Sequence, residues 1–267
     1  MQLESVTPFV VRTPAPHWGG RTWYFLRLET DTGLVGWGET AVLGTLAGLE
    51  ASYESLARQA FETYLKGNDP IHREALYAML YEGMTAQHPD YVTMGLISAF
   101  DTALWDICGK HYDTPVYNLL GGRYRDRVRS YTYIYDSDPS ASALDTIITW
   151  TSKPEHLAEL AVKLADEGFT GLKFDPLPQS RARRLPAPPW EISLAEYDHA
   201  ERAIGAIREA VGNRADILIG THGQITPSAA RRLAARGDQD DPVWLEEPWP
   251  PENYAEMGKI ADATSIP

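Results

Sequence analysis

Two stretches decide the fold: Leu172-Lys173-Phe174-Asp175-Pro176 and Trp244-Leu245-Glu246-Glu247-Pro248. Each is a short apolar strand pattern that ends in charged residues at a proline-containing turn, and each is followed by a helical pattern. In a βα barrel, the carboxyl ends of the strands carry the chemistry. Both stretches therefore predict strand ends at the mouth of one barrel.

The second half of the chain alternates strand and helix patterns, which predicts parallel strands with right-handed crossovers. We expect strands at Ser130–Tyr135, Gly171–Asp175, Ile217–Gly220 and Val243–Glu246, and helices at His156–Glu167, Leu194–Val211, Pro227–Ala235 and Pro251–Ala263. The 139 residues from Arg129 to Pro267 hold four such units, about half of the roughly 250 residues of an eight-stranded barrel. We therefore expect residues 128–267 to form the first half of a modified (β/α) barrel. A second polypeptide, a second copy or further residues would complete it.

Residues 1–127 predict a separate α+β domain. A three-stranded meander is expected first, followed by helices with no strand between them, which is typical of an α+β unit. The expected strands are Ser5–Arg12, Trp23–Glu29 and Leu34–Trp37, and the expected helices are Leu46–Leu65, Ile71–Gly83 and Thr93–Tyr112.

Composition narrows the class of protein. The chain of 267 residues has a formal net charge of −13 and no basic stripe, so we expect it to bind neither nucleic acid nor anionic membranes. Its one cysteine, Cys108, cannot form an internal disulfide, and the N-terminus lacks the pattern of a secretion signal. These features favour a cytoplasmic location. An anionic substrate would have to be captured by local cations or a metal.

Lys173 and Asp175 are two residues apart on a strand, so both point to the same face. A lysine at a barrel mouth can act as a base if neighbours lower its pKa, or it can hold an enolate by its charge. The alternative interpretation is a salt bridge without a catalytic role.

Glu246 and His222 extend the set of candidate residues at the strand ends. An inward-facing Glu246 can bind a hard cation or accept hydrogen bonds from buried donors, whereas Glu247 faces the opposite way. His222 lies in the turn Gly220–Gln224 after the third strand and can serve as a general acid, a base or a metal ligand. The alternative for His222 is a surface residue in a turn.

Two loops supply candidate substrate-binding residues. His17 and Trp18 lie in a glycine-containing stretch between the first two strands, which can form a flap over the site. Arg181 belongs to a proline-rich connection after the second barrel strand, where an arginine can clamp a substrate carboxylate. The alternative for this connection is a solvated loop.

Three motifs resemble those of the enolase superfamily, in its mandelate racemase and muconate lactonizing enzyme branch. The match is carried by Ala99–Lys110, Gly33–Glu39 and Trp244–Pro248, and it extends over essentially the whole chain. The resemblance implies an α+β capping domain on a modified barrel, with Mg²⁺ bound by carboxylates of the third, fourth and fifth strands. It also implies removal of an α-proton to give an enediolate that the metal stabilises.

Within that branch, Lys-Phe-Asp-Pro and the His-Gly pair are most similar to acid-sugar dehydratases of the gluconate or galactonate type. The resemblance implies that His222 protonates the departing β-hydroxyl, that Lys173 is the catalytic lysine and that Glu246 is a metal ligand. One position departs from the pattern. Gly220 stands where the family places its third-strand carboxylate, so either His222 joins the metal shell or the metal binds poorly.

We therefore expect a Mg²⁺-dependent hydro-lyase that converts a sugar acid, a small-molecule carboxylate, to a 2-keto-3-deoxy acid. In this hypothesis Asp175 orients Lys173, and the resemblance implies a homo-oligomer. Two alternatives remain open: racemisation or epimerisation of a 2-hydroxy acid, and a catalytically silent truncated homologue. Solvent deuterium exchange at the α-carbon without loss of water would favour the racemase.

Overall fold

The computed structural model of the chain describes residues 1–14, 22–42, 50–134, 153–177 and 191–267. The chain divides into two compact units, Met1–Asp126 and Arg127–Pro267. Among the helices in these ranges, none combines the length and the apolarity needed to cross a bilayer.

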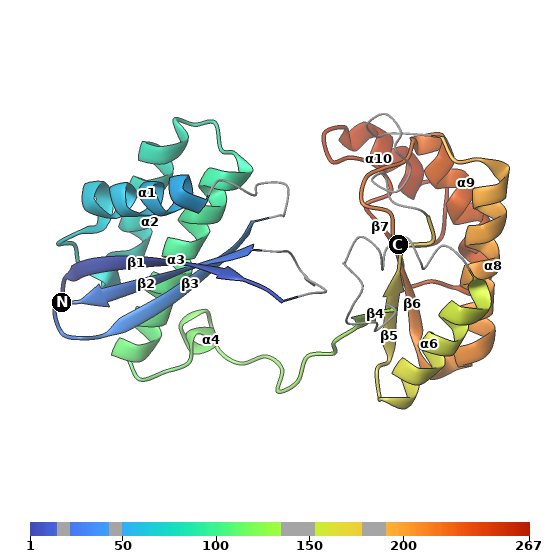
Figure 1. Ribbon diagram of the computed structural model, residues 1–267, viewed down its shortest axis with the longest axis horizontal. Coiled ribbons are helices and arrows are strands. Elements are labelled where there is room, and N and C mark those ends of the chain that lie inside the picture. Colours follow the sequence, from blue (N-terminus) through green and yellow to red (C-terminus); the bar gives the residue numbers. More distant parts are fainter. Residues whose placement is uncertain (15–21, 43–49, 135–152, 178–190) are drawn as a thin grey trace. The chain divides into compact units, whose positions relative to one another are not determined.

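The first unit is an α+β unit, as expected. Its antiparallel sheet has the order β1-β2-β3, and Figure 1 shows its helices grouped beside this sheet. The strands are β1 (Leu3–Arg12), β2 (Thr22–Thr30) and β3 (Val35–Val42). The helical elements are α1 (Glu50–Ala60), the π-helix η2 (Phe61–Leu65), the 3₁₀ turn η3 (Pro70–His72), α2 (Arg73–Thr85), α3 (Tyr91–His111) and α4 (Val116–Leu119).

Helix α3 packs directly on strand β3. The carboxylate of Asp90 caps the helix, because its Oδ1 accepts from the backbone N–H groups of Val92 at 2.9 Å and Thr93 at 3.0 Å. Glycine on the strand allows the close approach, since a Cβ atom at Gly38 would lie 1.7 Å from the carbonyl oxygen of Ala99. The sheet and this helix share the core of the first unit.

The second unit contains the expected parallel strands with alternating helices. Its sheet has the order β4-β5-β6-β7, and α6, α8 and α9 lie to one side of the strands (Figure 1). The strands are β4 (Thr132–Tyr133), β5 (Gly171–Phe174), β6 (Asp216–Gly220) and β7 (Trp244–Glu246). The helices are α6 (Pro154–Asp166), α8 (Leu194–Val211), α9 (Pro227–Gly237) and α10 (Tyr254–Ala261), with 3₁₀ turns η4 (Gly212–Arg214) and η5 (Asp238–Asp240).

Side-chain alternation divides each of these strands between two environments. Leu172 and Phe174 of β5 belong to the apolar core that also contains residues of α8 and α9. Lys173, between them, points to the opposite face. The pattern therefore leaves one face of the sheet to polar and charged side chains near the strand ends.

Two helix expectations were wrong in detail. The last helix begins at Tyr254 rather than Pro251, because the side chain of Asn253 caps it by accepting from the N–H of Glu256 at 3.2 Å. The described part of the first helix begins at Glu50 and changes at Phe61 into a π-helix, which hydrophobic spacing alone does not reveal.

Substitution of Gly38 tests the contact between β3 and α3. Gly38→Ala should lower the free energy of unfolding by about 3 kcal/mol, because the backbone of α3 would have to move. The matched control is Gly258→Ala in α10, where a Cβ atom meets nothing within 4 Å. This change should stabilise the helix by about 0.5–1 kcal/mol. Urea titration measures both, and a Gly38→Ala variant as stable as wild type would contradict the packing.

Candidate active site

The candidate active site lies at the carboxyl ends of β5, β6 and β7. The parallel register pairs Lys173 with Leu218, and Gly220 with Glu246. Because parallel strands end at the same edge of a sheet, the residues that follow them also meet there. The structure thus brings together four of the residues singled out from the sequence: Lys173, Asp175, His222 and Glu246.

Lys173 and Glu246 form an ion pair between Nζ and Oε1 that extends from β5 to β7. The lysine side chain is only 4% exposed, whereas that of Glu246 is 31% exposed. Lys173 Nζ also lies 5.0 Å from the ring centroid of Tyr133. Burial alone would lower the pKa of Lys173, but hydrogen bonds to Glu246 and Tyr133 outweigh it and raise the pKa. Lys173 is therefore held as a cation, which favours charge stabilisation over the role of a base.

Asp175 and His222 form a second pair between β5 and the turn after β6. Nε2 of His222 lies 2.8 Å from Oδ2 of Asp175, a contact that was not expected from the sequence. The Asp175 side chain is nearly fully buried. The hydrogen bond that Asp175 accepts raises the pKa of His222, with a smaller contribution from Glu247 and against the opposing effect of burial. The geometry therefore favours a protonated imidazole.

The turn that carries His222 is strained and firmly held. His222 has φ +55° and Glu247 has φ +48°, both in the left-handed region that L-residues rarely adopt. The hydroxyl of Thr221 donates to the carbonyl oxygens of Glu246 at 3.0 Å and Glu247 at 2.8 Å. The N–H of Gly223 donates to the Glu247 oxygen at 2.7 Å. Strain held in place by such contacts is characteristic of functional sites.

Gly220 provides the space in which these charged side chains meet. A Cβ atom at Gly220 would lie 2.4 Å from Oδ1 of Asp175 and 3.2 Å from Cε of Lys173. Gly220 is the position at which the resemblance implies a carboxylate that this chain lacks. In the structure, the carboxylate of Asp175 fills part of that position from the neighbouring strand.

Two tyrosines near Lys173 were missed by sequence analysis. The Lys173 ammonium lies 5.0 Å from the ring centroid of Tyr133 and 5.8 Å from that of Tyr131. Tyr131 directly precedes β4, and Tyr133 lies within it. Their spacing of two residues places both side chains on one face of the strand. That alternation, beside a buried lysine on the next strand, is the signal that would have identified them.

All three expected substrate-binding residues lie outside the described part of the chain. These are His17 and Trp18 of the expected flap and Arg181 of the expected clamp. Their roles stay predictions. Within the described ranges, no group of three or more His, Cys, Asp and Glu side chains is arranged to hold a metal ion.

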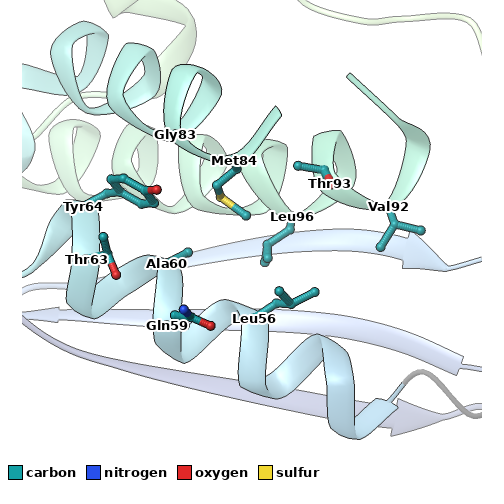
Figure 2. A pocket seen from close by; sticks show the side chains of 10 residues that line it. All are labelled: Leu56, Gln59, Ala60, Thr63, Tyr64, Gly83, Met84, Val92, Thr93 and Leu96. Carbon is teal, nitrogen blue, oxygen red and sulfur yellow. The ribbon is translucent and has the colours of Figure 1, made fainter. Parts of the chain in front are cut away.

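A cavity of about 260 Å³ lies elsewhere, within the first unit (Figure 2). It lies between α1, η2, α2 and α3, and its lining consists of Leu56, Gln59, Ala60, Thr63, Tyr64, Gly83, Met84, Val92, Thr93 and Leu96. The lining contains no charged side chain that could bind a carboxylate. The strand ends of the second unit are therefore the better candidate for the chemistry.

Comparison with known protein families gives two matches. Residues 9–121 match the model for the mandelate racemase / muconate lactonizing enzyme N-terminal domain. Residues 156–267 match the model described as enolase C-terminal domain-like.

Curated relatives include named sugar-acid dehydratases. The chain is 32% identical over 256 residues to a D-xylonate dehydratase of Haloferax volcanii, and 33% identical over 259 residues to a D-galactonate dehydratase family member of Streptomyces bingchenggensis. Both alignments cover 93% of this chain. The chain spans 56% and 60% of the lengths of these two relatives.

Solved structures agree with the family matches. A structure from Labrenzia alexandrii DFL-11 that carries the mandelate racemase/muconate lactonizing enzyme name has a TM-score of 0.89 and 38% identity, covering 100% of this chain and 67% of that one. The mandelate racemase/muconate lactonizing enzyme of Jannaschia sp. CCS1 has a TM-score of 0.87 and 37% identity, with coverage of 100% and 66%.

Removing the carboxylate of Glu246 tests the first ion pair. Glu246→Gln should lower the free energy of unfolding by about 2 kcal/mol, because it leaves the buried Lys173 ammonium without its anion. The loss is expected to be below the roughly 3–5 kcal/mol of a fully buried pair, since Glu246 is partly exposed. Glu247→Gln is the control, and this exposed neighbour should change stability by less than about 0.5 kcal/mol. Equal effects of the two substitutions in urea titrations would contradict the pairing.

The second pair predicts a pH dependence of stability. Because the pKa of His222 is raised in the folded state, its contribution is complete below the ordinary histidine pKa of about 6.5 and is lost as pH rises through the folded pKa. The unfolding free energy of wild type relative to His222→Gln should therefore fall with rising pH above that point. Asp175→Asn should flatten the fall. A relative stability that increases with pH in this range would rule out the assigned contact.

Proposed function

The chain belongs to the mandelate racemase/muconate lactonizing enzyme family of the enolase superfamily, and from this membership we propose that it forms part of a sugar-acid dehydratase. The reaction is loss of water from a polyhydroxy carboxylate through an enediolate, giving a 2-keto-3-deoxy acid. The names of the D-xylonate and D-galactonate dehydratase relatives support this substrate class.

One observation carries the proposal: a buried cation and a hydrogen-bonded imidazole lie at the same strand ends. Lys173 is held as an ammonium by Glu246 and Tyr133. His222 is held by Asp175 with its pKa raised. Dehydration needs these two capacities, because negative charge develops on the enediolate and the departing hydroxyl must be protonated.

Each side chain then has a defined task. The enediolate forms when a base takes the α-proton; that base is a group other than Lys173, Asp175, His222 and Glu246. Lys173 stabilises the negative charge that then develops on the substrate carboxylate. His222 donates a proton to the β-hydroxyl, which leaves as water. Asp175 orients the imidazole of His222, whereas the sequence had led us to expect that it orients Lys173.

Mg²⁺ is the cofactor that we propose for the complete enzyme, with Glu246 as one of its ligands. The observation in favour is that the Glu246 carboxylate lies at the strand ends and already binds a cation there, the ammonium group of Lys173. Hard oxygen ligands of this kind suit Mg²⁺. When bound, the metal would supply additional positive charge beside the enediolate. We further propose, from the family membership, a homo-oligomeric enzyme in the cytoplasm.

The proposed roles predict which substitutions abolish turnover. With Mg²⁺ and a panel of sugar acids that includes D-xylonate and D-galactonate, His222→Asn should reduce keto-acid formation by about 10²–10⁴-fold. Lys173→Met should reduce it by about 10²–10³-fold, because it removes charge stabilisation. The controls are His111→Asn and Lys163→Met, two residues with exposed side chains.

Chelation provides a separate measurement. EDTA should stop keto-acid formation, and added Mg²⁺ should restore it. Full activity in either His222→Asn or Lys173→Met, or no turnover of any sugar acid by the wild-type protein, would contradict the proposed function.

A further inference from the structure

The two ring nitrogens of His222 face different surroundings. Nε2 lies 2.8 Å from Oδ2 of Asp175, whose side chain is 4% exposed. Nδ1 lies on the other side of the ring, 3.8 Å from Oε2 of Glu247, whose side chain is 62% exposed. Nε2 therefore faces the buried interior of the unit, and Nδ1 faces its open side.

We propose that Asp175, His222 and Gly220 form one functional group of residues, in which Asp175 holds Nε2 and His222 presents Nδ1 to the substrate. Asp175 and Gly220 are positioning residues in this arrangement. The transfer of the Nδ1 proton to the β-hydroxyl of a sugar acid rests on the proposed function. The arrangement of the three residues rests only on the contacts between them.

The proton transfer is balanced in this arrangement. The Nδ1–H bond breaks and an O–H bond forms on the departing β-hydroxyl. The electron pair of the enediolate forms a Cα=Cβ double bond and restores the carboxylate, while the Cβ–O bond breaks and water is released. The imidazole is left neutral with its remaining proton on Nε2, where Asp175 accepts the hydrogen bond. The ring therefore keeps a partner both before and after the transfer.

Gly220 is required for space rather than for its backbone conformation. It is absent from the described glycines with positive φ, so another residue could adopt its backbone conformation. A Cβ atom there, however, would lie 2.4 Å from Oδ1 of Asp175, which is closer than such atoms approach in real structures. An alanine at Gly220 would displace the carboxylate that holds His222.

The backbone of the turn is held in place independently of Asp175. His222 is held at φ +55°, and Gly223 follows at φ +64°. The Thr221 hydroxyl and the Gly223 N–H anchor the turn to the end of β7. The charged groups around the ring are Asp175, Glu247 and Lys173. Asp175 is the one within hydrogen-bonding distance, so it selects which nitrogen is engaged.

Nitrogen-15 NMR of the histidine-labelled chain tests which nitrogen is bound. We expect a downfield N–H proton in slow exchange with solvent, correlated to Nε2 and assigned to His222 by its loss in His222→Gln. The signal should disappear in Asp175→Ala and in Gly220→Ala, and it should persist in Gly258→Ala. A protected proton on Nδ1, or a signal that survives Asp175→Ala, would overturn the proposal.

A double-mutant cycle keeps the role of Gly220 testable if Gly220→Ala folds poorly. Gly220→Ala should lower the urea midpoint in the wild-type chain, because Asp175 and the new methyl group compete for the same space. In the Asp175→Ala background the same substitution should have little effect. Equal shifts in the two backgrounds would overturn the assigned role of Gly220.

Neither measurement involves turnover, so their failure is distinguishable from failure of the proposed function. Keto-acid formation together with an Nδ1-protected ring would overturn the arrangement and leave the dehydratase proposal standing. An Nε2-protected ring in a protein without turnover on any sugar acid would overturn the dehydratase proposal, and with it the assigned destination of the proton.

Discussion

The missing side chain at Gly220 is the constraint on which the charges at the strand ends depend. In the order β4-β5-β6-β7, strand β6 lies between the two strands that carry Lys173 and Glu246. The lysine can form its ion pair only by crossing β6, and its Cε lies 3.2 Å from the position of a Gly220 Cβ atom. Asp175 uses the same space to reach His222. Both ion pairs therefore use a residue at the end of β5, and both depend on the absence of a side chain at Gly220 of β6.

Pairing is what allows two charged residues to be buried at the end of β5. The side chains of Lys173 and Asp175 are each 4% exposed, and an unpaired charge at that depth would be strongly destabilising. Each instead meets an opposite charge that is partly exposed, Glu246 or His222. The buried member of each pair is fixed by packing, while the exposed member remains accessible from the open side. This division suits a site that must be rigid and still admit a polar substrate.

Much of the fold and of the site could be predicted from the sequence, for a physical reason. Alternating strand and helix patterns imply parallel strands, and parallel strands place their carboxyl ends together, so Lys173, His222 and Glu246 were expected at one mouth. The partner of Asp175 could not be predicted in this way. A spacing of two residues determines the face of a strand but not the direction in which a side chain leans across the sheet. That direction depended on Gly220, whose importance is spatial and leaves no periodic signal.

The surroundings of Gly220 change the interpretation of the glycine that stands where the family pattern has a carboxylate. From the sequence, a glycine in place of a carboxylate indicates a lost ligand. In the structure, the carboxylate of Asp175 extends from β5 into the space that a side chain at Gly220 would occupy. The loss on β6 and the position of Asp175 are therefore two aspects of one packing arrangement. A side chain missing from an inner strand changes the reach of both neighbouring strands, because their side chains fill the space it leaves. The chemistry of this site belongs to three adjacent strands together, and no single position in the sequence describes it.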